Sequence, residues 1–503
     1  MRLAYPILFA LLLGLPFVLR HFQTDGTDAE RPQGDALKLV VVTPHNGDIR
    51  GEFATAFDRW YRQHYRASVV IDYHVPGGTS DMIRLLANKP TGLDVAWGGG
   101  DYTFYHDLQP KGILQPMHLD PPLMRAAFPH DALAGVRLYD PTKDSAGNPT
   151  PQWVGACLSS FGITYNPQLY QALELSPPQT WADLTNPKLF RLIALADPAH
   201  SGSASVAYMM VIQRAMADAE EELFSRRPEL KKLPRPELAR RAEYRDAISA
   251  GWKRGMGELV LIAANARYFT DSSEIVPTDV GRGEAAAGMS IDFYARVTEE
   301  TVGADRSQFV LPRAATAITP DAVAILSGTS GRQLELATRF VEFLLSREGQ
   351  LLWILRPGEP GGPIRRSPRR MPVRADVYAN QTGWADHGNP FIESGGFNQR
   401  GQWMGLMSDT SPIWIAAWID SRDALTDACV AILSVKDPTR CAALFAVLAD
   451  VPVTMQDVER RQAERTALEQ SHGDANLWNA RQRILWSDRF RKHYFEVAAE
   501  ARQ

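Results

Sequence analysis

The sequence predicts an α/β protein built as two lobes. The chain has 503 residues, of which 45% are hydrophobic and 22% charged, and a single hydrophobic core rarely extends over that length. Near its start, three apolar runs are each followed by a turn and a helical pattern. Successive strand-then-helix units indicate a mainly parallel sheet covered by helices, whose loops after the strands share one edge. Ligands of such sheets bind at that edge.

The first 20 residues predict export. Arg2 precedes an uncharged, mostly apolar run from Leu3 to Leu19, which ends at Arg20. As a helix this run would be about 26 Å long, against a hydrocarbon core of about 30 Å. No A-x-A cleavage site follows, so residues 1–20 are expected to be a signal peptide or an uncleaved signal anchor, and both remain open. Residues 21–36 form a polar linker, and the expected location is periplasmic or otherwise extracytoplasmic, with the uncleaved segment as a membrane tether.

Residues 37–152 are expected to form the first part of lobe 1. The runs 37–43, 68–75 and 93–97 read as buried strands. Between the first two, residues 44–65 turn through Pro44 and continue as a helix with its apolar side chains at helical spacing.

Residues 153–312 are expected to form lobe 2, and residues 313–375 return to lobe 1. Strands are predicted at 154–165, 190–197 and 286–293, a helix begins near Ser201, and a long charged helical region spans about 215–254. The return carries a strand at 321–327 and an apolar helix near Leu336. Residues 376–503 form a mainly helical extension, whose mixed-charge stretch 455–470 is expected to be a solvated helix face, with a partner-docking helix as the alternative.

Charge and cysteine content narrow the function classes. A net charge of −4 gives no reason to expect a nucleic-acid partner. Cys157, Cys429 and Cys441 are too few and too dispersed for a disulfide framework or a zinc site. Cys157 is expected in a buried strand. Cys429 and Cys441 could pair across a helical hairpin or remain buried thiols, and the sequence leaves both open.

The loops after the first three strands supply the ligand candidates of lobe 1. These are Thr43, His45, Asn46, Thr79, Ser80, Gly99, Gly100 and Asp101. A loop histidine can bond a ligand, a helix start offers free amides to an anion, and glycine lets the backbone approach a ligand closely. Each also has a structural alternative, because asparagine, serine and aspartate commonly form turns or cap helices.

In lobe 2 the stretch 196-ADPAHSGSAS-205 raises the question of a Ser/His catalytic pair. The serines do not lie in a G-x-S-x-G elbow, and His200 is adjacent in sequence, which rarely gives the geometry of a proton relay. We therefore expect Ser201, Gly202 and Ser203 to open a helix and present amides to a ligand, and a hydrolase is the least favoured alternative. Asp292 and Tyr294, at the end of a strand, are expected to face the cleft, with a buried tyrosine as the alternative.

Another basic segment, 365-RRSPRR-370, is expected to be an exposed loop with solvated charges. Docking of an anionic partner is the alternative.

The succession 41-VVTPHNGDIRGEF-53, 76-PGGTSDMIRLLA-87, 94-DVAWGGGD-101, 181-WADLTNPKLFRLIALADPAHSGS-203, 290-SIDFYAR-296 and 341-VEFLLSREGQ-350 resembles bacterial extracellular solute-binding proteins, in the branch that includes ferric-iron, thiamine and phosphonate or sugar-phosphate binders. The resemblance covers about residues 37–378. It implies a type II periplasmic-binding-protein-like clamp, in which strands cross between two lobes as a hinge and the ligand lies in the cleft.

The resemblance also implies a role. The chain would be a non-enzymatic component of an ABC importer, without cofactor or bound metal, that delivers a small polar, anionic solute to a membrane permease. A ferric-iron-binding transport protein is one alternative, although Tyr294 with His45 and Asp292 would be a thin ligand set for iron. A sensor or adaptor is another. The extension would pack outside lobe 1 or dock a partner.

Overall fold

The structure is a computed structural model that describes residues 36–393, 397, 399–471 and 474–503. The expected signal segment 1–20, and all but the last residue of the expected linker, lie outside the described residues. Nine strands form the main sheet: β1 Leu37–Val42, β2 Val69–His74, β3 Val95–Trp97, β6 Val154–Tyr165, β7 Ile193–Ala196, β8 Ala266–Thr270, β9 Ala287–Ile291, β10 Gln308–Val310 and β11 Ile318–Ile325.

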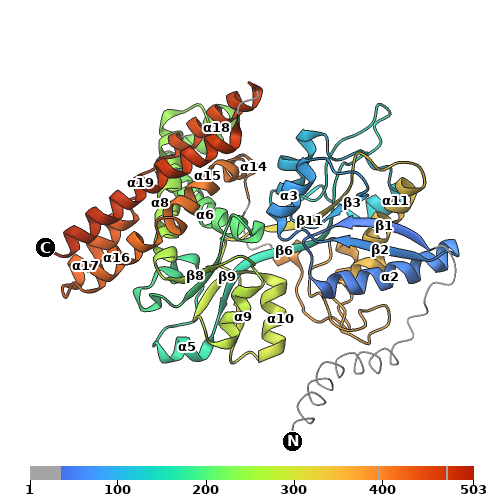
Figure 1. Cartoon of the computed structure of the whole chain (residues 1–503), viewed down its shortest axis with the longest axis horizontal. Coiled ribbons are helices and arrows are strands. Elements are labelled where there is room, and N and C mark those ends of the chain that lie inside the picture. Colours follow the sequence, from blue (N-terminus) through green and yellow to red (C-terminus); the bar gives the residue numbers. More distant parts are fainter. Residues whose placement is uncertain (1–35, 394–396, 398, 472–473) are drawn as a thin grey trace, which may run out of the picture.

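The sheet runs through both lobes in the order β2-β1-β3-β11-β6-β9-β7-β8, with β10 also paired to β6. Strand β6 belongs to both lobes. Its first half pairs with β11, up to Ser160 opposite Ile318, and its second half pairs with β9, from Phe161 opposite Ile291. Lobe 1 is therefore the part around β1, β2, β3 and β11, and lobe 2 the part around β7 to β10. The chain thus has the expected two-lobe α/β architecture (Figure 1).

In lobe 1 the predicted strand-helix units are present. Strands β1 and β2, and β1 and β3, are parallel, whereas β11 returns antiparallel to β3. Helix α2, Gly47–Tyr65, buries Ile49, Phe53 and Phe57. The ring of Phe53 lies 5.2 Å from that of Trp97. The other helices of this lobe are α3 Thr79–Ala87, α4 Pro121–Ala127, α11 Gly331–Leu345 and α12 Arg347–Leu352.

Lobe 2 has two strands that the sequence did not predict, β8 and β10. The charged stretch 215–254 is not continuous, because one helix ends at Arg226 before Pro228 and the next long one begins at Ala242. Strand β8 was not predicted, since no glycine or proline separates it from the preceding helix. The helices are α5 Pro167–Ala172, α6 Gly202–Arg226, α7 Arg235–Leu238, α8 Ala242–Ala264, α9 Ile275–Arg282 and α10 Asp292–Val302.

Residues from 390 onward form the helical C-terminal extension. Its helices are α13 Pro390–Glu393, α14 Gly401–Met404, α15 Met407–Trp414, α16 Arg422–Leu433, α17 Pro438–Ala449, α18 Met455–Gln470 and α19 Ala475–Ala501. The expectation that it packs outside lobe 1 is wrong. It covers α6 and α8 of lobe 2 (Figure 1), where a β-carbon on Gly257 of α8 would lie 2.2 Å from the Ala449 carbonyl oxygen. The absent side chain of Gly257 lets α17 approach this closely.

Two further expectations concern the extension. Helix α18 is not solvated throughout, because the buried Arg461 and the half-buried Arg465 form ion pairs with the fully buried Asp409 of α15. Cys429 and Cys441 are free thiols, as is the buried Cys157. Among the described residues, no helix combines the length and apolarity needed to cross a membrane.

Candidate functional site

A cavity of about 480 Å³ lies between the two lobes. Lobe 1 contributes the loops that follow β1, β2 and β3. Lobe 2 contributes the start of α6 and the end of β9. Ten of the residues expected from the sequence line this cavity: His45, Asn46, Thr79, Gly99, Gly100, Asp101, Ser201, Gly202, Ser203 and Tyr294. Thr43, Ser80 and Asp292 do not.

Two helix starts meet in the cavity wall. Helix α3 begins after Gly78 and helix α6 after Ser201, whose hydroxyl accepts a hydrogen bond from the Ala204 amide at 3.2 Å. A β-carbon on Gly202 would lie 3.2 Å from Thr79, so the two starts are in close contact. The first two amides of each helix have no acceptor among the described residues. Two positive helix ends, one from each lobe, thus lie side by side in the cavity wall.

A buried charge cluster forms the wall of the cavity at the lobe crossing. The Asp321 carboxylate of β11 lies 2.9 Å from His45 Nε2 and accepts a hydrogen bond from Arg370 Nη1. Burial alone would raise the pKa of Asp321, but Arg370 and His45 hold it well below its usual range. Burial lowers the pKa of His45 more than Asp321 raises it, which favours the neutral imidazole. The cluster is a buried Arg–Asp ion pair with the His45 imidazole beside it.

The glycine loop after β3, Gly98 to Gly100, donates hydrogen bonds to this cluster. The amides of Gly99 and Gly100 donate to Asp321 Oδ1 at 2.7 and 2.9 Å. Gly98 has a φ of +96°, and a β-carbon there would lie 2.8 Å from the His45 ring. The loop therefore needs glycine to reach Asp321, and its two bonded amides are not available to a ligand.

Of the remaining lobe 1 candidates, Thr43 and Asn46 make hydrogen bonds within the protein, and Asp101 lines the cavity. Thr43 is fully buried, and its hydroxyl lies 3.0 Å from His45 Nδ1 and accepts from the His45 amide. Asn46 caps α2 by accepting from the Ile49 amide. Asp101 lines the cavity, and burial raises its pKa to about 7. Asp101 therefore titrates near neutral pH.

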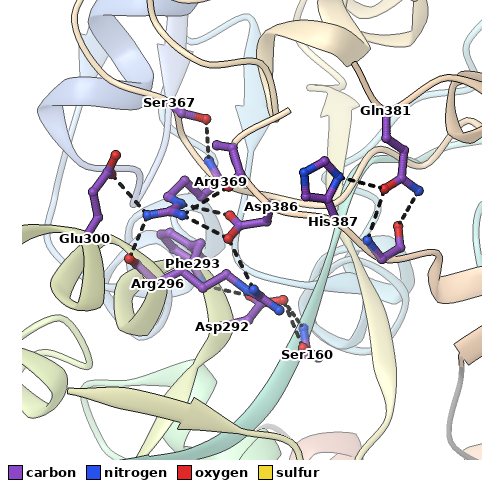
Figure 2. A network of polar contacts seen from close by, with 12 residues as sticks. Ser160, Asp292, Phe293, Arg296, Glu300, Ser367, Arg369, Gln381, Asp386 and His387 are labelled. Carbon is purple, nitrogen blue, oxygen red and sulfur yellow. Dashed lines mark hydrogen bonds and ion pairs between the residues drawn. The ribbon is translucent and has the colours of Figure 1, made fainter. Parts of the chain in front are cut away.

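The expectation that Asp292 faces the cleft is wrong. Strand β9 ends at Ile291 and α10 begins at Asp292, so the carboxylate turns back toward β6. There it accepts from the amide and hydroxyl of Ser160 at 2.8 and 2.9 Å (Figure 2). Burial raises the pKa of Asp292. Tyr294, the third residue of α10, does line the cavity.

The expectation of a solvated loop at 365–370 holds for the exposed Arg365 and Arg366 but is wrong for Arg369 and Arg370. Arg370 is 3% exposed and belongs to the charge cluster. Arg369 bridges the lobes (Figure 2): its guanidinium donates to Asp386 and to the Arg296 carbonyl of α10, and it pairs with Glu300 at 3.1 Å. The Arg296 side chain also donates to Asp386, at 3.2 Å. Arg369 thus links the segment that follows lobe 1 to α10 of lobe 2.

Several cavity residues have no counterpart in the sequence-based expectations. They include Arg50, Ser159, Phe161, Glu274, Phe293, Asp321, Arg370 and Met407. One signal was available: Asp321 opens the apolar run predicted as a strand at 321–327, and a buried carboxylate requires a cationic partner. The sequence gives no way to choose that partner.

Among the described residues, neither a hydrogen-bonded Ser/His pair around His200 nor a group of metal-ligating side chains is present. His200 lines the cavity, but within the described part of the chain no hydrogen bond joins it to Ser201 or Ser203. Nor is any group of three His, Cys, Asp or Glu side chains in the described ranges placed to hold a metal ion.

Comparison with known proteins gives a consistent result. A family model described as bacterial extracellular solute-binding protein matches residues 103–356. The periplasmic binding protein AfuA from Actinobacillus pleuropneumoniae, solved with exogenous fructose-6-phosphate bound, is similar with a TM-score of 0.51 and 19% identity over 77% of this chain and 98% of that one. Iron-bound HitA from Pseudomonas aeruginosa has a TM-score of 0.46 and 16% identity over 74% and 96%. Curated protein sequences include no match.

Proposed function

The chain belongs to the bacterial extracellular solute-binding proteins, and from this premise we propose that it captures a small anionic solute between its lobes and delivers it to an ABC permease. Family membership places it outside the cytoplasm. A tether through an uncleaved N-terminal segment is part of the proposal.

The adjacent starts of α3 and α6 carry this proposal. Each presents amides without an acceptor among the described residues, one from lobe 1 and one from lobe 2. An anion between them would accept hydrogen bonds from both lobes and relieve the repulsion between two positive helix ends. Because the ligand contacts both lobes only when the cleft is closed, binding favours closure.

A phosphorylated sugar is the first ligand class to test. AfuA, which shares the fold, has fructose-6-phosphate bound. The proposal that the ligand is ferric iron is weaker, because oxygen ligands that iron would need are already hydrogen-bonded within the protein. The Asp292 carboxylate is bonded to Ser160, and the hydroxyl of Tyr102, another cavity residue, is bonded to Ser408. Of the three expected iron ligands, only His45 and Tyr294 line the cavity, and His45 is paired with Asp321.

Thermal unfolding of the full chain with separate probes tests the proposal. The probes are inorganic phosphate, sulfate, fructose 6-phosphate, thiamine and ferric citrate. A ligand at 100 times its Kd stabilises the folded state by about 2.7 kcal/mol. We expect a shift with at least one of the three anions and none with thiamine.

Two glycine variants locate the site. Gly202→Val places a side chain against Thr79 and is expected to weaken anion binding at least about tenfold, the effect of losing a hydrogen bond to a charged group. Gly401→Val is the matched control, because Gly401 also opens a helix but has open space around it. Ser201→Ala removes only the cap and is expected to retain binding. Unchanged affinity in Gly202→Val, or esterase turnover abolished by Ser203→Ala, would contradict the proposal.

A further inference from the structure

The C-terminal extension is attached firmly to lobe 2. Glu220 of α6 is buried and accepts a bidentate pair of hydrogen bonds from Arg400, together with bonds from Arg235 and Tyr244. The Arg400 amide donates to Gln213 of the same helix. With α17 packed on α8, the extension moves with lobe 2.

The extension also reaches lobe 1 on the far side of the cleft. The Gln399 amide donates to the Ala134 carbonyl at 3.1 Å. A β-carbon on Gly135, whose φ is +81°, would lie 2.4 Å from the Gln399 oxygen. Further along, the Ser408 hydroxyl lies 2.6 Å from the Tyr102 hydroxyl of lobe 1. A unit attached to one lobe therefore contacts the other at two points.

Three consecutive residues of α15 connect this contact to the cavity and to the extension. Met407 lines the cavity between the lobes. Ser408 bonds Tyr102, which lines the same cavity. Asp409 is fully buried and pairs with Arg465 at 3.0 Å, which fixes α15 to α18.

We propose that the C-terminal extension is a third wall of the cargo cavity, in which Met407 limits the space for cargo and Ser408 joins lobe 1 through Tyr102 when the cleft closes. These residues lie beyond residue 356, where the family match ends. The role of Met407 toward a bound solute rests on the proposed function, whereas the contact between the extension and lobe 1 does not.

Interlobe distances in the full chain without ligand test the inference. Spin labels at Arg59→Cys of lobe 1 and Lys231→Cys of lobe 2, both exposed, report the separation in a Cys441→Ser background. Ser408→Ala is expected to lower the ratio of closed to open molecules about threefold to tenfold, the range for one hydrogen bond. Ser408→Thr retains the hydroxyl and is expected to restore the ratio. Met407→Trp is expected to lengthen the closed distance by filling the cavity.

The matched control is Ser434→Ala, an exposed serine of the extension whose hydroxyl bonds only its own helix, at Val430. It is expected to leave the distances unchanged. A Ser408→Ala protein with the distances of the unaltered chain, or a Met407→Trp protein that closes to the same distance, would overturn the inference. If no probe anion binds, the proposed function fails, but these distances still decide the inference.

Discussion

Replacing Asp101 by asparagine is expected to stabilise the chain at pH 8 but hardly at pH 4. Burial raises the pKa of Asp101 from 3.8 to about 7. The folded state therefore favours the neutral acid, while the unfolded chain ionises above pH 4. The stability of the unaltered chain falls as the pH rises from 3.8 to 7 and levels off above 7.

The size of the effect follows from the shift. One pKa unit corresponds to 1.36 kcal/mol, so a shift of about three units amounts to about 4 kcal/mol at pH 8. Urea titrations at a series of pH values, followed by tryptophan fluorescence, give the free energy of unfolding of both proteins. The asparagine variant is expected to gain with rising pH by up to this amount.

The control is Asp246→Asn, which removes an exposed carboxylate on α8. At pH 8 its free energy of unfolding is expected to differ from that of the unaltered chain by less than about 0.5 kcal/mol, as for most surface substitutions. A constant difference between Asp101→Asn and the unaltered chain from pH 4 to pH 8 would refute the reasoning, because it would mean that Asp101 is ionised in the folded state throughout.

Three further predictions concern the buried charges. Arg370→Met leaves Asp321 buried without its cation and is expected to lower the free energy of unfolding, measured by urea titration, by about 3–5 kcal/mol. The double variant Arg370→Met/Asp321→Leu is expected to recover most of this loss. Equal losses in the single and the double variant would contradict the prediction. Glu220→Gln weakens the attachment of the extension to lobe 2, and limited proteolysis is expected to release the extension faster, with unchanged cleavage as the contrary result. Arg369→Gln removes the bridge from Asp386 to α10, so the radius of gyration in solution is expected to rise, and an unchanged radius would show that the network does not hold the lobes.

Local signals were sufficient for most of the strand-helix units. Strand β6 coincides with its predicted run, and Ser201 caps α6 as its sequence context indicated. Such features depend on residues that are close in the sequence, so they can be predicted from it. The helix starts at the cavity follow from the same local rules once the strands are ordered in a parallel sheet.

The charge cluster could not be predicted in this way. Asp321 and Arg370 are 49 positions apart, and the arginine lies in a run that looks solvated because four positive charges and a proline usually remain on the surface. Only tertiary structure brings that run under the cleft. The lobe on which the extension packs could not be predicted for a similar reason, because its apolar helices could cover either lobe.

The late return of the chain to lobe 1 has a consequence for synthesis. Lobe 1 cannot complete its sheet when its first strands emerge, because β3 pairs with β11 and that strand begins only at residue 318. Until then, apolar β3 has an unpaired edge. Pairing over so long a sequence separation is slow, so we expect lobe 1 to complete its sheet only after most of the chain has been synthesised.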